Sequence, residues 1–181
     1  GWGPEDQMPI VDLARRMEDV GVRALTIHCR TAKMGHSGAA DWSWVARAVE
    51  VVDMPVILNG DVKSAQDAKR AIDETGAAGV MIGRRAIEHP WIFREVRRFL
   101  DDGVLIDPPT VSERLNLCRE HLVANVAHRG EPRGVFCTRR HLSGYIRGLR
   151  RASHLRQELF QCDTLAGCLE LLDRFEGTLA A

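Results

Sequence analysis

The sequence has 181 residues, of which 45% are hydrophobic, 28% charged and 6% aromatic, a balance that excludes a disordered or fibrous chain. It holds no apolar run near the roughly 18 residues that a membrane span needs and no signal peptide in residues 1–6, so a cytoplasmic protein is predicted. Basic and acidic residues balance at 25 each, but residues 1–109 carry a charge of −3 and residues 110–181 a charge of +3, which makes the second region the candidate for an anionic partner.

Strand and helix patterns alternate over the first hundred residues. Apolar residues at helical spacing predict helices, and short apolar runs predict strands. A Ser64 and Asp67 capping pair and Gly76 set the limits of one helix, and Pro90 is expected as the first residue of another. In chain order the expected elements are helix 10–20, strand 23–28, helix 41–52, strand 55–58, helix 64–76, strand 79–82 and helix 90–100.

This alternation predicts an α/β fold with a parallel sheet. Each strand ends in a polar or glycine cluster, which favours a TIM (β/α)₈ barrel, where such loops form the active face. A complete barrel takes about 250 residues, and three strands cannot close one. We therefore expect residues 1–107 to be the C-terminal part of a barrel in a longer protein, with three to four βα units and a preceding half-barrel missing.

The pattern becomes helical after Pro108 and Pro109. Thr110 and Glu113 form a capping box, and the following apolar spacing predicts a small all-α domain over residues 110–181. Its expected helices cover residues 110–126, 135–149, 153–160 and 164–179.

Polar side chains that suit a ligand follow the first predicted strand. His28 and Arg30 are two residues apart, so they share a face if the strand continues, and both would point toward one ligand. A histidine and a planar guanidinium suit a flavin, a nucleobase or a phosphate. The alternative is a histidine bonded to a backbone carbonyl and an arginine paired with an acid.

The next two strand ends carry comparable clusters. Asn59, Gly60 and Asp61 follow the second strand, where glycine allows a ligand close to the backbone, although such residues also form ordinary turns. Gly83 and Arg84 follow the third strand, where a backbone amide and a guanidinium suit a phosphate. The recurrence at three successive strands predicts a phosphate-bearing cofactor such as flavin mononucleotide (FMN).

The same segments carry a family resemblance. Residues 24–31 (ALTIHCRT), 55–61 (PVILNGD), 80–84 (VMIGR) and 89–93 (HPWIF) resemble the C-terminal half of a bacterial tRNA-dihydrouridine synthase. The helices that follow also resemble that family's C-terminal helical domain, including the positions Arg139, Arg140, His141 and Tyr145. The resemblance implies an FMN-binding TIM barrel that reduces uridine in tRNA to 5,6-dihydrouridine with NADPH.

The resemblance assigns roles to individual positions. It implies FMN contacts for His28, for the turn of Asn59, Gly60 and Asp61, and phosphate contacts for Gly83 and Arg84. Arg30 is implied to lie close to the flavin or the substrate. Cys29 departs from the family, which more often has glycine there, and a small side chain still fits.

The family's catalytic cysteine, a general acid, is expected upstream of Gly1, together with a lysine that contacts FMN. Gly1 and Trp2 resemble the residues that follow the strand carrying that lysine. The sequence has five cysteines, none in a C-x-x-C pair, and none corresponds to the general acid, so no catalytic residue is assigned in this chain. The isolated chain is therefore predicted to be inactive.

An arginine-rich segment is the candidate surface for tRNA. Residues 112–156 contain ten arginines and three acids, a surplus that suits a phosphate backbone. The spacing of Arg140, Arg147 and Arg151 predicts one basic helical face, with Tyr145 either stacked on a base or packed inward. The RNA-binding candidates are Arg139, Arg140, Arg147, Arg150 and Arg151.

Two other functions also fit the residues. One is a different FMN-dependent barrel oxidoreductase of the dihydroorotate or ene-reductase type, which would not need an arginine-rich tail. The other is a noncatalytic RNA-binding half-barrel without flavin. No metal site and no membrane partner are expected. Trp42, Trp44, Trp91 and Phe93 are expected in the core.

Overall fold

The computed structural model describes residues 9–35 and 37–180, so Gly1 and Trp2 lie outside the described residues. The chain divides into two compact units. The first runs to Ala86 and includes Pro90–Ile106. The second comprises Ile87–His89 and Asp107–Ala181.

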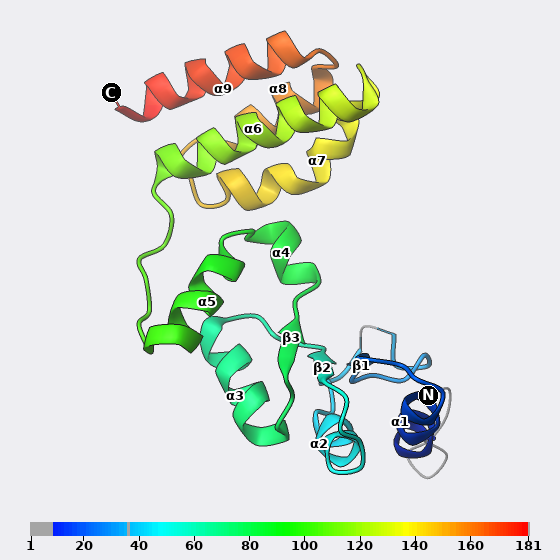
Figure 1. Cartoon of the computed structure of the whole chain (residues 1–181). Coiled ribbons are helices and arrows are strands. Elements are labelled where there is room, and N and C mark those ends of the chain that lie inside the picture. The colour runs from blue at the N-terminus through cyan, green and yellow to red at the C-terminus, as the bar shows by residue number, and fades with distance from the viewer. Residues whose placement is uncertain (1–8, 36, 181) are drawn as a thin grey trace. The chain divides into compact units, whose positions relative to one another are not determined.

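A small parallel sheet lies at the centre of the first unit, and its strands are adjacent in chain order, β1-β2-β3 (Figure 1). The strands are β1 (Leu25–His28), β2 (Val56–Asn59) and β3 (Gly79–Met81). The register pairs His28 with Asn59 and Asn59 with Met81 at the carboxyl edge. The α/β class and the parallel sheet predicted from the sequence are therefore confirmed.

Helices cover one face of this sheet. Ile27 and Leu58 on that face are buried in a core with small helical residues such as Ala48 and Ala68. On the opposite face, Thr26, His28 and Met81 are exposed. The helices of the unit are α1 (Ile10–Asp19), α2 (Ser43–Val49), α3 (Ala65–Thr75) and α5 (Ile92–Asp102), and α4 (Arg84–Glu88) begins in this unit and ends in the second.

The boundaries of α3 follow the local signals in the sequence. Ser64 Oγ accepts a hydrogen bond from the amide of Asp67 at 3.0 Å, and Gly76 ends the helix in the left-handed conformation with φ 67°. The first feature fixes where the helix begins and the second where it ends, and the next strand starts at Gly79.

The region after β3 differs from the prediction. The short helix α4 was not expected, and α5 begins at Ile92 rather than at Pro90. Ile92 and Val96 are buried, whereas Phe93 is 56% exposed, so the expectation that Phe93 lies in the core was wrong. Phe93 is one residue, about 100° of helix rotation, away from the buried row that Ile92 begins.

The second unit contains a helical bundle in which α6 and α7 run alongside each other (Figure 1). Thr110 and Glu113 form the expected capping box at the start of α6. α7 ends at Ile146, three residues earlier than predicted, and Gly148 follows with φ 76°. The helices are α6 (Val111–Arg129), α7 (Arg133–Ile146), α8 (Ala152–Gln161) and α9 (Leu165–Ala180).

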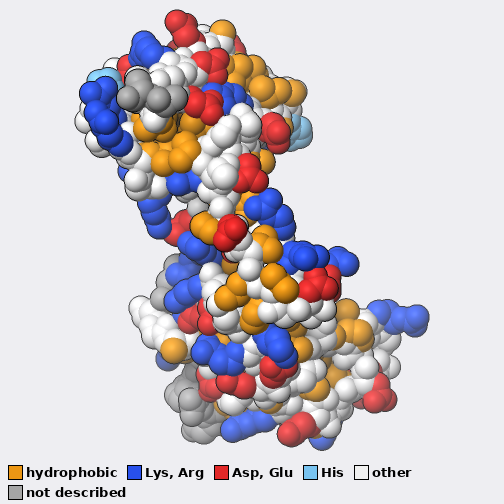
Figure 2. All heavy atoms as spheres, turned by 90° about the vertical axis from the view of Figure 1, so that its left-hand side faces the viewer, with side chains coloured by type: hydrophobic (Ala, Val, Ile, Leu, Met, Phe, Trp, Pro, Cys, Tyr) orange, Lys and Arg blue, Asp and Glu red, His pale blue; other side chains and the backbone are white. Residues whose placement is uncertain are grey.

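The exposed sides of α3 and α5 carry ion pairs between residues four apart, including Lys69–Asp73 and Arg97–Asp101. On the face shown in Figure 2, basic and acidic side chains are interspersed. In the part of the chain that the structure describes, every helix is too short or too polar to cross a membrane.

Candidate functional site

The carboxyl edge of the sheet brings the ends of β1, β2 and β3 together. Nδ1 of the exposed His28 ring lies 3.1 Å from the carbonyl oxygen of Asn59. Since a carbonyl only accepts, Nδ1 donates this bond, which leaves Nε2 as the ring nitrogen that can bind another group. The side-chain Nδ2 of Asn59 in turn donates to the backbone carbonyl of Met81 at 2.8 Å. These bonds hold both side chains in fixed positions across the three strand ends.

Asp61 connects four neighbouring groups just beyond β2. Its carboxylate accepts hydrogen bonds from the guanidinium of Arg30 and from the amide of Ala40, the latter at 2.9 Å. Nη2 of Arg84 lies 3.5 Å and Nζ of Lys63 lies 3.9 Å from Asp61 Oδ1. The Arg30 hydrogen bond is the main reason that the pKa of Asp61 falls to about 2, so this carboxylate is charged at neutral pH.

Arg30 lies inside the unit, whereas His28 is exposed. Only 3% of the Arg30 side chain is exposed, and its Nη2 also donates to the carbonyl of Gly38 at 2.9 Å. Its Nε makes no hydrogen bond within the described part of the chain. Arg30 is thus paired with an acid and His28 with a backbone carbonyl, the arrangement that the sequence offered as the alternative to two side chains pointing at one ligand.

The turn of Asn59, Gly60 and Asp61 depends on a close approach of two loops. Gly60 has φ 137° and Asp61 has φ 56°, both in the left-handed region. A Cβ at Gly60 would lie 2.9 Å from Cβ of Ala40. The indole of Trp42 donates to the Gly60 carbonyl at 2.9 Å. Glycine is required here by the loop that carries Ala40 and Trp42.

Gly83 and Arg84 stand at the open part of the same edge. A Cβ added to Gly83 would meet no described atom within 4 Å, so the space beside its backbone is free for another group. The Arg84 side chain is 56% exposed and is oriented from one side by Asp61. A guanidinium that is held but still exposed can bind an anion such as a phosphate.

Cys29 lies next to these residues but does not face the edge. The thiol is buried, and its Sγ is 3.8 Å from the carbonyl oxygen of Ile27. Burial and the negative charge of Asp41 are the main causes that raise the pKa of Cys29 to about 11. A buried, protonated thiol of this kind is a packing residue, not a nucleophile.

Three neighbours of this edge, Lys63, Ala40 and Trp42, were not among the site residues predicted from the sequence. Lys63 follows Asp61 by two residues and is one of three lysines in the chain, so its position was the only available signal. The amide of Ala40 has no signal in the sequence because its contact spans 21 residues.

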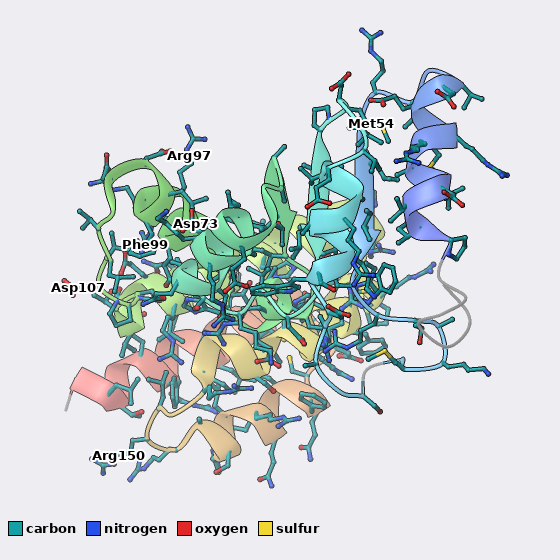
Figure 3. All side chains as sticks on the ribbon, turned by 90° about the horizontal axis from the view of Figure 1, so that it is seen from below. Met54, Asp73, Arg97, Phe99, Asp107 and Arg150 are labelled. Carbon is teal, nitrogen blue, oxygen red and sulfur yellow. The ribbon has the colours of Figure 1, made fainter. Side chains whose placement is uncertain are left out.

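The arginines of the second unit fall into two groups. Arg139 is partly buried, donates to the carbonyl of Cys162 at 3.0 Å, and stacks 4.2 Å from the centre of the Phe136 ring. It therefore has a structural role within the bundle. Arg140, Arg147, Arg150 and Arg151 are exposed, and in Figure 3 the Arg150 side chain extends away from the ribbon.

The prediction that Arg140, Arg147 and Arg151 share one helical face was wrong. α7 ends at Ile146, Arg147 is its C-cap, and Arg151 has φ 60° at the N-cap of α8. Helical spacing does not apply across a turn that contains Gly148. The Tyr145 side chain packs inward, where its hydroxyl lies 2.8 Å from Nδ1 of His121.

Comparison with known proteins identifies similar sequences over nearly the whole chain. The dihydrouridine synthase (Dus) family model matches residues 1–179. A probable tRNA-dihydrouridine synthase 1 of Synechocystis sp. is 37% identical over 174 residues, which cover 96% of this chain and 48% of the relative. A probable tRNA-dihydrouridine synthase of Mycobacterium tuberculosis is 36% identical over 93% of this chain and 44% of its own length. The tRNA-dihydrouridine synthase B of Xanthomonas axonopodis pv. citri is 36% identical over 93% of this chain and 51% of its own length. The chain thus spans about half the length of these curated relatives.

Proposed function

Because the chain belongs to the dihydrouridine synthase family, we propose that it forms part of an FMN-dependent oxidoreductase that reduces uridine in tRNA to 5,6-dihydrouridine with NADPH. The observation that carries the proposal is the family match over residues 1–179. It favours this activity over that of a dihydroorotate-type or ene-reductase barrel, because the relatives named above are tRNA-dihydrouridine synthases.

We propose that β1, β2 and β3 are consecutive strands of a TIM barrel. Three features support this: the strands are parallel, they are adjacent in chain order, and the helices of the described residues cover only one face. Parallel sheets are normally covered on both faces, and barrel closure covers the second one. The barrel part corresponds to residues 1–107, and residues 110–181 form the helical domain.

The residues at the carboxyl edge fit FMN. Arg84 offers an exposed guanidinium, Gly83 leaves free space beside its backbone, and the exposed His28 ring has Nε2 on the side away from its bond to Asn59. We propose that Arg84 and Gly83 hold the phosphate, while His28 and Asn59 contact the rest of the cofactor. FMN, when bound, supplies hydride transfer from NADPH to the uracil ring. Gly60 and Asp61 contribute by shaping the turn and by orienting Arg84.

A general acid must complete the reaction, because hydride addition to the uracil ring requires a proton. Cys29 does not fit this role, since its thiol is buried against the Ile27 carbonyl. We expect the general acid in the part of the relatives' length that this chain does not span. The 181 residues alone are therefore expected not to reduce uridine.

The helical unit is the proposed tRNA-binding region. The segment of residues 112–156 contains ten arginines and only three acidic residues. Four of these arginines are exposed, namely Arg140, Arg147, Arg150 and Arg151. A surplus of arginine suits the phosphates of RNA. We place Arg139 among the residues that shape this region, because its guanidinium is used within the bundle.

The test uses the complete natural polypeptide that contains these residues. After purification, its absorption spectrum and the cofactor released on heating show whether FMN is bound. The protein is then incubated with NADPH and a tRNA that lacks dihydrouridine, and the digested tRNA is examined by mass spectrometry. Bound FMN and NADPH-dependent formation of dihydrouridine are expected.

Two other results would contradict the proposal. A flavin-free protein that still binds tRNA would be a noncatalytic RNA-binding protein. A flavoprotein that oxidises NADPH with a small enone but leaves tRNA unchanged would be a different barrel oxidoreductase.

A further inference from the structure

Two phenylalanine rings lie at the surface of the helical unit. Phe136 on α7 is 44% exposed, and Phe160 near the end of α8 is 42% exposed. Their chain neighbours Val135 and Leu159 are buried in the bundle. Burial of a phenylalanine ring is one of the larger hydrophobic contributions to stability, and these two rings leave that contribution incomplete.

Arginine side chains join the two rings into one cluster. The guanidinium carbon of Arg139 lies 4.2 Å from the centre of the Phe136 ring and 5.7 Å from the centre of the Phe160 ring. The guanidinium carbon of Arg156 lies 5.3 Å from the Phe160 centre. These distances are within the roughly 6 Å over which a cation interacts with an aromatic ring. The contacts run from Phe136 through Arg139 and Phe160 to Arg156, and these four side chains form the aromatic–arginine cluster.

Both helices hold this cluster in place. Phe136 and Arg139 are three residues apart on α7, and Arg156 and Phe160 are four residues apart on α8, so each pair shares a helix face. Nη2 of Arg139 donates to the carbonyl of Cys162, the C-cap of α8, at 3.0 Å. This bond ties the α7 part of the cluster to the end of α8. A ligand that binds here therefore meets side chains that are already ordered, which lowers the entropic cost of binding.

The charge of the two helices favours an anionic ligand. α7 contains three arginines and no acidic residue. α8 contains one arginine, Arg156, and one acidic residue, Glu158, whose carboxylate is paired with Arg174 of α9. Exposed rings beside cations match the two components of unpaired RNA, because bases stack on aromatic rings and on guanidinium planes, and phosphates bind arginine.

We propose that the aromatic–arginine cluster is a stacking surface for unpaired bases of tRNA. Phe136 and Phe160 provide the rings, Arg156 provides an exposed planar cation, and Arg139 holds the two rings together. Such stacking accepts any base, because every base has an aromatic face. The inference rests on the proposed tRNA substrate, and it adds contacts to bases to the phosphate contacts proposed for the exposed arginines.

The first test is photo-crosslinking of the complete natural polypeptide without any substitution. The probe is a single-stranded oligoribonucleotide that carries 5-iodouridine, which crosslinks to aromatic side chains stacked on it. After tryptic digestion, mass spectrometry is expected to find the crosslink in residues 134–139, which contain Phe136, or in residues 157–174, which contain Phe160. The same strand in a duplex is expected to give no crosslink in these peptides, because its bases are paired. Absence of single-strand crosslinks from both peptides would overturn the proposal.

The second test separates stacking from charge. Phe136→Leu and Phe160→Leu each remove an aromatic face but no charge, so each should raise the Kd for the single strand about fivefold without changing the salt slope. Arg156→Gln should lower that slope by about 1. Phe93→Leu is the matched control, because Phe93 is 56% exposed on α5, and its Kd is expected to equal that of the wild-type protein. Thermal unfolding verifies that each variant is folded. An unchanged Kd in both ring variants, or an equal loss in Phe93→Leu, would refute the stacking surface.

The stacking surface and the enzymatic proposal fail in different ways. A polypeptide that forms dihydrouridine but gives no crosslink in either peptide would retain the proposed function and lose the stacking surface. A polypeptide that lacks FMN and forms no dihydrouridine, yet crosslinks through Phe136 or Phe160, would lose the enzymatic proposal and retain the stacking surface.

Discussion

The buried guanidinium of Arg30 is paired with the carboxylate of Asp61, which lies 31 residues further along the chain. This pair joins the loop after β1 to the turn after β2. The second oxygen of the same carboxylate faces Arg84, whose guanidinium is exposed. One acidic residue therefore connects the interior of the first unit to the side chain that we propose for phosphate binding.

Replacing Asp61 with asparagine should destabilise the protein strongly. The substitution leaves the Arg30 cation buried without a counter-charge, which typically costs about 3–5 kcal/mol. Urea unfolding followed by circular dichroism measures the loss. Asp73→Asn is the matched control, because its exposed ion pair with Lys69 contributes less than about 1 kcal/mol. Equal effects of the two substitutions would show that the Arg30–Asp61 pair adds no more stability than an exposed ion pair.

Stability should fall at acid pH because of the same carboxylate. The pKa of Asp61 is lowered to about 2 from an ordinary value of 3.8, mainly by the Arg30 hydrogen bond. A lowered folded-state pKa gives stability that is present above the unfolded-state pKa and is lost as pH falls toward the folded-state pKa. About 2 kcal/mol should disappear between roughly pH 5 and pH 2. This part of the pH dependence should be absent in Asp61→Asn and retained in Asp73→Asn.

Features that depend on neighbouring residues could be predicted from the sequence. Ser64 and Gly76 set the limits of α3, and Thr110 with Glu113 starts α6, because capping bonds join residues a few positions apart. The alternation of apolar strand and helix segments is also readable from neighbouring residues, and it predicted the parallel sheet. These signals fix the α/β class and place His28, Asn59 and Arg84 at one edge.

Contacts between distant residues could not be predicted in this way. Nothing near Arg30 in the sequence shows that its partner is Asp61, or that a backbone amide of Ala40 completes the carboxylate's hydrogen bonds. Similarly, the spacing of Arg140 and Arg147 gave no sign that α7 ends between them at Ile146. Ion pairs between distant residues determine which arginines are buried, and the end of α7 determines which arginines share a helical face.

A larger residue at Gly134 should disrupt the packing of α7 on α6. A Cβ at this buried position would lie 2.5–2.7 Å from backbone atoms of Asn125 and Val126. Backbone cannot move aside as a flexible side chain can, so Gly134→Ala should destabilise by about 1–3 kcal/mol in urea unfolding. Gly177→Ala on α9 is the control, since its Cβ would meet nothing within 4 Å and alanine favours helix by about 1 kcal/mol. A stabilising Gly134→Ala would contradict the close helix contact.

Arg84→Ala should weaken FMN retention in the complete natural polypeptide. Loss of a charge-assisted contact to a phosphate typically costs about 1.5–3 kcal/mol, or roughly a tenfold or greater increase in Kd. The Kd is measured by the quenching of FMN fluorescence on binding. Arg97→Ala on α5 removes the same charge from an exposed ion pair with Asp101, and in Figure 3 Arg97 lies on the outside of the unit. Unchanged FMN affinity in Arg84→Ala would refute the phosphate assignment.

The exposed and buried arginines of the helical unit should differ in their effects on tRNA binding. Arg150→Ala removes a solvent-exposed cation, so it should weaken binding of all tRNAs and lower the slope of log affinity against log salt by about 1. Arg139→Ala should instead lower the unfolding temperature, because it removes the bond to the Cys162 carbonyl and the contact with the Phe136 ring.

Arg174→Ala completes this comparison as a matched control. Arg174 is exposed like Arg150, but its guanidinium is paired with the carboxylate of Glu158, so its charge is largely neutralised within the unit. Filter binding at several salt concentrations gives the slopes, and thermal unfolding gives the stability of each variant. If Arg150→Ala and Arg174→Ala give the same salt slope as the wild-type protein, Arg150 does not contact RNA phosphate. If only Arg150→Ala lowers the slope, the turn between α7 and α8 is part of the tRNA-binding surface, because the substitution removes one exposed cation from that turn.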